Sequence, residues 1–207
     1  FVYGCLRLFY GSKYAAGLLR PAVTALQSRS LAAYLHQDPS HRERGPTKES
    51  DAILKYLVTK YDIPEHWYPR QPERRARVDE YTAFHHSYTR PHAAAVFILE
   101  VLLPAQTGAP VDEERLNHAL VRLDDTLDKL ESMFLRRQPF LCGDDITVAD
   151  LLAVCELMQP MGGDRDVLKL RPLLQHWRSR VQSAVGEAFD NTHRVLYNVR
   201  ERRRAKL

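Results

Sequence analysis

One short stretch, GDDITVADLLAV at positions 143–154, specifies the start of a helix in unusual detail. Thr147 is a favourable N-cap residue, because its hydroxyl can accept a hydrogen bond from the backbone N–H of Asp150. The Asp150 carboxylate can accept from the N–H of Thr147 in return, which completes a capping box. Ile146 and Leu151 occupy the two positions of a hydrophobic staple. This structural capping box predicts a core helix, because the apolar residues that follow recur at helical spacing.

Helical periodicity continues through most of the chain from residue 47 onward. The strongest amphipathic pattern steps by fours and threes through Leu116, Leu120, Leu123, Leu127, Leu130 and Phe134. Further helices are predicted over residues 47–61, 73–103, 172–186 and 188–203. Pro91 is expected to kink or break the second of these, and residues 103–114 are expected to form a loop. Because no convincing pair of alternating strands is found, the expected fold class is mainly α.

Composition excludes several classes of protein. With 207 residues, 44% of them hydrophobic and 27% charged, the chain is expected to be globular. No apolar run approaches the roughly 18 residues of a membrane span, so no membrane partner is expected. The formal net charge is +4, with basic residues concentrated at the two ends. A solvated helix end explains the basic C-terminal tail more simply than a nucleic-acid partner does, and none is expected.

Cysteine and histidine usage argues against a metal site. Cys5, Cys142 and Cys155 form neither a CxxC pair nor a zinc spacing, which favours a reducing compartment and a cytoplasmic protein. Three histidines lie on one predicted helix, at His85, His86 and His92. Adjacent histidines point in different directions on a helix, and no carboxylate follows four residues later. No metal is therefore expected.

Several segments, in their order and spacing, resemble the theta class of the cytosolic glutathione S-transferases. They are TKESDAILKYL, WYP, RARVDEY, FLCGDDITVADLLAVCELMQPMG and WRSRVQSAVGE, and the match covers about three quarters of the chain. The resemblance implies a thioredoxin-like N-terminal half that binds glutathione, an all-helical C-terminal half that binds an electrophile, and a dimer. Glutathione is then the co-substrate, with no other cofactor. The expected fold is a glutathione-transferase C-terminal-like helical bundle with a truncated, non-standard N-terminal segment, in which the capping box is a folding element.

The resemblance also implies a division of the chain into four parts. Residues 1–46 form an atypical N-terminal segment, and residues 47–62 correspond to the last helix of the thioredoxin-like domain. Residues 63–72 are a proline-containing linker, and residues 73–207 form the C-terminal transferase domain. The first 37 residues contain no acidic residue, so a targeting segment and an organellar form are a further interpretation.

Glu49 and Ser50 are the best candidates for binding glutathione. They stand at the start of a predicted helix, where free N–H groups and the helix dipole favour an anion. By resemblance they hold the γ-glutamyl end of glutathione, whereas a simple helix cap formed by Thr47 and Ser50 is the alternative. Arg90 by resemblance supports the thiolate or an anionic substrate group, and a surface ion pair is its alternative. Trp177 is either a core residue or a wall of the electrophile pocket.

The hydroxyl that activates the thiol in this family has no clear counterpart here. The family pattern of a strand followed by SQPCR-like residues is not found, and Ser12 is only loosely similar. A βαβ unit alone needs about 30 residues, so a 46-residue segment leaves little room for a thioredoxin-like half. We expect a theta-type transferase that conjugates glutathione to alkyl halides and similar small electrophiles by thiolate attack, and is impaired in this form. The alternative is a non-catalytic interaction module.

Overall fold

A computed structural model describes residues 49–61 and 63–205 of the chain. The described α-helices are α4 (Ser50–Lys60), α5 (Pro72–Phe84), α6 (Arg90–Phe97), α7 (Leu103–Thr107), α8 (Glu113–Lys129), α9 (Val148–Leu157), α10 (Pro172–Val185) and α11 (Ala188–Arg204). Short 3-10 helices are η2 (Glu65–Trp67) and η6 (Gln159–Gly163), and π turns are η3 (His85–Thr89), η4 (Ile98–Leu102) and η5 (Leu130–Phe134). Across these ranges no strand forms, beyond one isolated bridge between Phe140 and Gly143. The mainly α prediction is confirmed.

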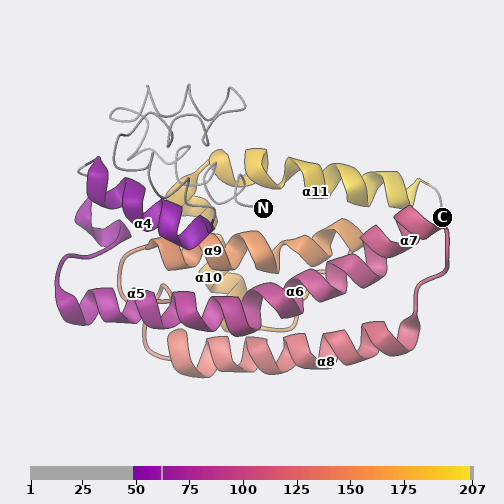
Figure 1. Cartoon of the computed structure of the whole chain (residues 1–207), viewed down its shortest axis with the longest axis horizontal. Coiled ribbons are helices and arrows are strands. Elements are labelled where there is room, and N and C mark those ends of the chain that lie inside the picture. The colour runs from indigo at the N-terminus through magenta and orange to yellow at the C-terminus, as the bar shows by residue number, and fades with distance from the viewer. Residues whose placement is uncertain (1–48, 62, 206–207) are drawn as a thin grey trace, which may run out of the picture.

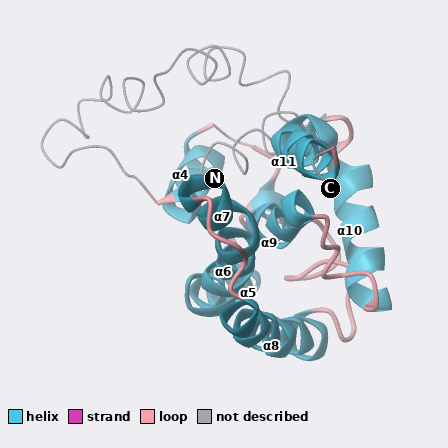
Figure 2. Ribbon diagram, turned by 90° about the vertical axis from the view of Figure 1, so that its right-hand side faces the viewer, coloured by secondary structure: helices cyan, strands magenta, loops and turns pink. Residues whose placement is uncertain are grey.

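The helices surround α9, which runs through the middle of the bundle (Figure 1). Helices α4, α5, α6 and α10 all contact it. Helix α8 packs on the outer side of α6, and α11 lies on the side of α9 away from α8 (Figures 1 and 2). Every residue of α9 from Val148 to Leu157 is buried. The helix whose start carries the capping box is therefore a helix with no exposed face.

The carboxylate of Asp150 is the centre of the hydrogen bonds that start α9. Its Oδ2 accepts from the backbone N–H and the hydroxyl of Thr147, at 2.9 and 3.1 Å. Its Oδ1 accepts from the N–H of Leu141 at 2.9 Å and from Nε1 of Trp177 at 2.8 Å. The reciprocal bonds of the capping box are present, and the Thr147 hydroxyl also accepts from the N–H of Ala149. Burial raises the pKa of the Asp150 carboxyl, while these hydrogen bonds oppose the shift.

Pro91 was expected to kink or break the helix in which it lies, and the structure shows that the break does not occur. The chain stays helical from α5 through η3 into α6, and the π turn comes directly before the proline. In that turn the N–H of Arg90 donates to the carbonyl of His85, five residues back. A proline ring collides with the carbonyl four residues back in a regular α-helix. The wider π turn accommodates the ring, so the helix continues past it.

The expected loop at 103–114 also contains more helix than predicted. Pro104 follows a second π turn, in which the N–H of Leu103 donates to the carbonyl of Ile98. Because Pro104 has no N–H, the carbonyl of Glu100 lacks its normal donor, and Nη1 of Arg203 from α11 donates to it instead. The helix continues as α7 and ends at Gly108, whose φ of 71° is left-handed. The loop is limited to the residues from Gly108 to Asp112, which is the N-cap of α8.

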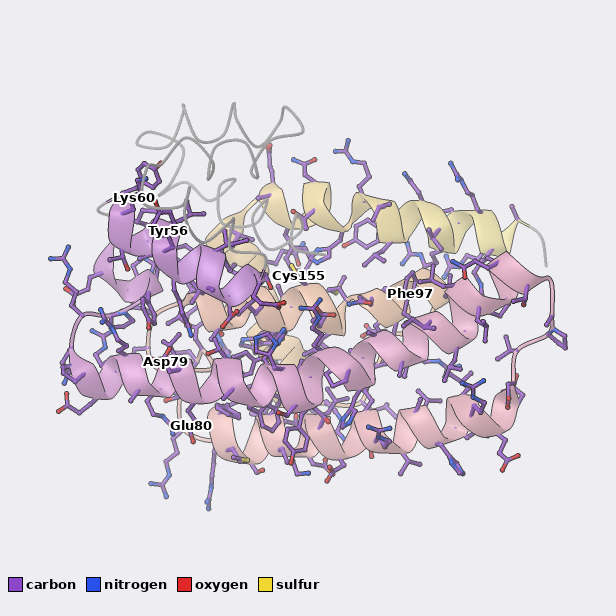
Figure 3. All side chains as sticks on the ribbon, viewed as in Figure 1. Tyr56, Lys60, Asp79, Glu80, Phe97 and Cys155 are labelled. Carbon is purple, nitrogen blue, oxygen red and sulfur yellow. The ribbon has the colours of Figure 1, made fainter. Side chains whose placement is uncertain are left out.

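Other helix boundaries follow the sequence closely. Helix α10 begins at Pro172 and ends before Gly186, as predicted. Gly186 has a φ of 63°. Helix α11 also has its predicted extent. Two glycines let η6 pack against the α6–η4 segment: a Cβ on Gly162 would lie 2.6 Å from the Phe97 ring. Phe97 is labelled in Figure 3, on α6. The predictions on residues 1–46, including Ser12 and a targeting segment, concern residues outside those described.

Replacing Asp150 with asparagine tests whether its four donors stabilise the bundle. Each carboxylate oxygen accepts two hydrogen bonds, so an amide nitrogen at either position leaves at least one buried N–H donor without an acceptor. We expect Asp150→Asn to lower the free energy of unfolding by about 3 kcal/mol, because the orphaned donors are buried. Urea denaturation measures this. The exposed Asp145→Asn variant is the control, and a loss for Asp150→Asn no larger than in this control would contradict the prediction.

Buried His193 predicts a loss of stability on acidification. Its pKa is lowered to about 4 by burial, which outweighs the opposing effects of the Phe189 backbone and of Asp190. Below pH 6.5 the unfolded chain binds a proton at this site, whereas the imidazole in the folded chain stays neutral down to about pH 4. The free energy of unfolding therefore decreases as the pH is lowered from 6.5 towards 4. The His193→Phe variant should therefore gain about 2 kcal/mol relative to the parent chain between pH 7 and pH 5.

Urea denaturation of both chains at the two pH values measures this gain. The exposed His118 provides the matched control position, because His118→Phe removes an imidazole that faces solvent. Equal effects of His193→Phe at both pH values would show that this imidazole does not stay neutral in the fold.

Candidate functional site

The candidate site lies at the N-terminal end of α4. The helix begins at Ser50, and Glu49 is its N-cap residue, with extended backbone dihedrals of −78° and 131°. Ser50 is buried, with 4% of its surface exposed, whereas the Glu49 side chain is 67% exposed. Thr47 is outside the described residues, so its proposed cap remains a prediction. The first N–H groups of a helix have no partner within the helix, which makes this end attractive to an anion.

Arg90, the first residue of α6, connects three elements at this end of α4. Its Nη1 lies 3.9 Å from Oε2 of Glu49, and its Nε lies 3.8 Å from Oε1 of Glu156 on α9. The Arg90 side chain is 39% exposed, so the guanidinium lies between solvent and the interior. The structure thus brings together the sequence candidates Glu49, Ser50 and Arg90, because α4 and α6 both pack on α9.

Glu156 is a member of this cluster that the sequence analysis missed. It is 4% exposed, and its Oε2 accepts a hydrogen bond from Nε2 of Gln159. Burial raises the pKa of its carboxyl to about 7, and the nearby Arg90 opposes the shift. A signal was present in the sequence: Glu156 is a charged residue within the apolar run LLAVCELM. Carboxylates are rarely buried without a partner, so this position indicated a polar contact.

A set of charged side chains holds α4 on the helical bundle. Nζ of Lys55 lies 2.8 Å from Oδ1 of Asp79 on α5 and donates to the hydroxyl of Thr82 at 2.9 Å. Figure 3 shows Asp79 on α5, next to α4. Nε2 of His86 in η3 lies 3.4 Å from Oδ1 of Asp51. These contacts orient the start of α4 relative to Arg90, although exposed pairs of this kind each contribute little to stability.

The three histidines considered as metal ligands do not gather. His85 is buried beside Tyr81, with its Nδ1 3.4 Å from the Tyr81 hydroxyl, and its pKa is lowered to about 3 by burial. Nε2 of His92 accepts from Arg122 at 2.9 Å, so its Nδ1 carries the proton and donates to the Thr126 hydroxyl at 2.7 Å. Both ring nitrogens of His92 are therefore occupied. Within the described ranges no three metal-binding side chains converge.

Trp177 lies in the core beside the start of α9. Its side chain is fully buried, and its indole N–H is occupied by Asp150. Burial of this kind favours the core interpretation over a pocket wall. A cavity of about 210 Å³ lies toward the other end of α4, lined in part by Val58, Tyr68 and Arg75. That cavity includes none of the candidate residues.

No helix among the described residues has the length and apolar character needed to cross a membrane. A family model described as "Glutathione S-transferase, C-terminal domain" matches residues 82–184. The chain is 42% identical over 154 residues to glutathione S-transferase theta-1 of Gallus gallus, a match covering 74% of this chain and 59% of that protein. The chain thus spans less than two thirds of the length of this relative.

Comparison with solved structures indicates the same family relationship. Human glutathione S-transferase T1-1 in its apo form superimposes with a TM-score of 0.77 at 33% identity, covering 97% of this chain and 89% of that chain. Human glutathione transferase theta-2, in complex with glutathione and an unknown ligand, gives a TM-score of 0.72 at 37% identity, covering 77% and 66%. Because sequence and fold agree over this extent, the chain belongs to the glutathione S-transferase family and is a relative of its theta class.

Proposed function

We propose that this protein binds glutathione at the N-terminal end of α4. The observation that carries the proposal is the position of Ser50, buried in the first turn of an 11-residue helix, with Arg90 and Glu49 beside it. In this assignment the Ser50 hydroxyl and N–H bind the γ-glutamyl carboxylate, and Glu49 pairs with the ammonium group. A relative of the theta class is known in complex with glutathione, which supports the same ligand here.

The proposed reaction is conjugation of glutathione to a small electrophile such as an alkyl halide. The glutathione thiolate attacks carbon, a C–S bond forms as the carbon–halogen bond breaks, and the halide leaves with the electron pair. The Arg90 guanidinium stays ionised and favours negative charge on the sulfur or on an anionic substrate group. The hydroxyl that stabilises the thiolate has not been identified in this sequence. The proposal therefore includes impaired conjugation by this form of the chain.

The proposal extends to organisation and location. We assign residues 47–62 to the last helix of a thioredoxin-like domain, residues 63–72 to the linker and residues 73–207 to the C-terminal domain. A homodimer and a cytoplasmic location accompany this assignment. Cys142 is a free thiol in the described part of the chain, which is the state expected in a reducing compartment. A non-catalytic interaction module is the second candidate, favoured by the lack of an identified catalytic hydroxyl.

Removing the Ser50 hydroxyl tests the glutathione site. We expect Ser50→Ala to weaken glutathione binding about tenfold, because one hydrogen bond to a charged carboxylate is lost. Isothermal titration calorimetry of the 207-residue chain measures the affinity. Ser179→Ala is the matched control, because Ser179 is an exposed helix serine whose hydroxyl donates to the carbonyl of Gln175. Equal affinities of the two variants would argue against Ser50 as a ligand.

Conjugation activity separates the two candidate functions. The purified chain, mixed with glutathione and a haloalkane, should release halide at close to the uncatalysed rate while still binding to immobilised glutathione. Release far above the uncatalysed rate would show that the chain supplies its own activating group and is not impaired. Failure to bind immobilised glutathione, together with capture of one specific protein partner, would favour the interaction module.

A further inference from the structure

The two acidic residues of α9 have very different surroundings. Asp150 is fully buried and accepts four hydrogen bonds from three different parts of the chain. Glu156 is nearly as buried, but Gln159 is the one close donor found for it in the described part of the chain. Its cationic neighbour, Arg90, stays 3.8 Å away. Since burying a carboxylate without full compensation is costly, this arrangement calls for an explanation.

Arg90 is shared between two carboxylates on opposite sides. Glu156 approaches its Nε from the interior, and Glu49 approaches its Nη1 from the exposed start of α4. Neither distance is that of a tight ion pair, for which N–O separations of 2.7–2.9 Å are usual. The guanidinium therefore forms a tight ion pair with neither carboxylate, and its positive charge can interact with either one.

We infer that Glu156 is a positioning residue that acts through Arg90: its buried carboxylate competes with an anion at the start of α4 for the charge of the guanidinium. This inference rests on the proposed function, because the anion it concerns is the glutathione held there. When Glu156 is neutral, the Arg90 charge favours an anion at the helix start. When Glu156 is ionised, it draws that charge toward the interior and adds a negative charge of its own.

Burial places this change in the neutral pH range, because the pKa of the Glu156 carboxyl is raised to about 7. Other charged or titratable groups stand on the elements packed against α9, and the experiment has to separate them. They are Glu49 and Asp51 at the start of α4, Tyr81 on α5, His85 and His86 in η3, Arg90 on α6 and Asp150 on α9 itself. Among them His86 is an exposed histidine, and its ring is paired with Asp51.

The test compares binding of S-methylglutathione by the full chain and by Glu156→Gln at pH 6 and pH 8. The blocked thiol cannot ionise, and any titration of the remaining ligand groups cancels when the two proteins are compared at the same pH. At pH 6 the two affinities should agree within about twofold, because Glu156 is mostly neutral. At pH 8 the variant should bind roughly tenfold more tightly, because the competing charge is gone. An affinity ratio that is the same at both pH values would overturn the inference.

Two control variants identify the group responsible. Glu100→Gln replaces another buried helix glutamate, which is paired with Arg165 at 2.7 Å and lies in η4. This variant should keep the pH dependence of the parent chain. His86→Gln should keep it as well, and loss of the dependence in His86→Gln instead of Glu156→Gln would assign the effect to the histidine and overturn the inference. Thermal denaturation of each variant checks that the fold is retained.

A second measurement does not need the ligand. The ¹⁵Nε resonance of Arg90, followed by NMR in the free protein, should shift with a midpoint near pH 7 in the parent chain and stay constant in Glu156→Gln. If S-methylglutathione fails to bind at any pH, the proposed function fails, and this resonance decides the inference separately. A resonance that does not titrate in the parent chain, or that titrates equally in the variant, overturns it.

Discussion

The four hydrogen bonds to the buried carboxylate of Asp150 are the contacts on which the rest of the bundle depends. They join the segment before α9 at Leu141, the helix start at Thr147 and the α10 helix at Trp177. Because every residue of α9 is buried, a start displaced by one residue would rotate each side chain by about 100° into the wrong neighbours. The same bonds therefore set where Glu156 lies, six positions further along the helix.

The long helical segment from α5 to α7 has the complementary role of carrying side chains to the site. Two π turns precede Pro91 and Pro104, and each absorbs a proline that would otherwise interrupt the segment. Arg90 stands at the junction of the first π turn and α6, where it reaches both α4 and α9. Helix deviations of this kind are frequent at functional sites, and here the arginine of the candidate site directly follows the π turn.

Much of the fold could be predicted from the sequence, because its signals are local. The N-cap at Thr147, the heptad-like spacing of Leu116 and its successors, and the limits of α10 at Pro172 and Gly186 all follow from neighbouring residues. The possible break at Pro91 does not occur, and residues 103–107, which were predicted as part of a loop, form α7. Proline rules assume a regular α-helix, whereas this chain uses π turns. Glu49, Ser50 and Arg90 were identified by resemblance, and the structure places them together at the start of α4.

The sequence by itself determined where the helices begin, which of their faces are apolar and which family the chain resembles, because caps and periodicity act over a few residues. Only the tertiary structure decided that Glu156 from α9 lies beside Arg90 from α6 and opposite Glu49 from α4. It also decided that this carboxyl is buried, which is the physical cause of its raised pKa. Desolvation and charge pairing depend on distances between elements far apart along the chain, and no local pattern encodes those distances.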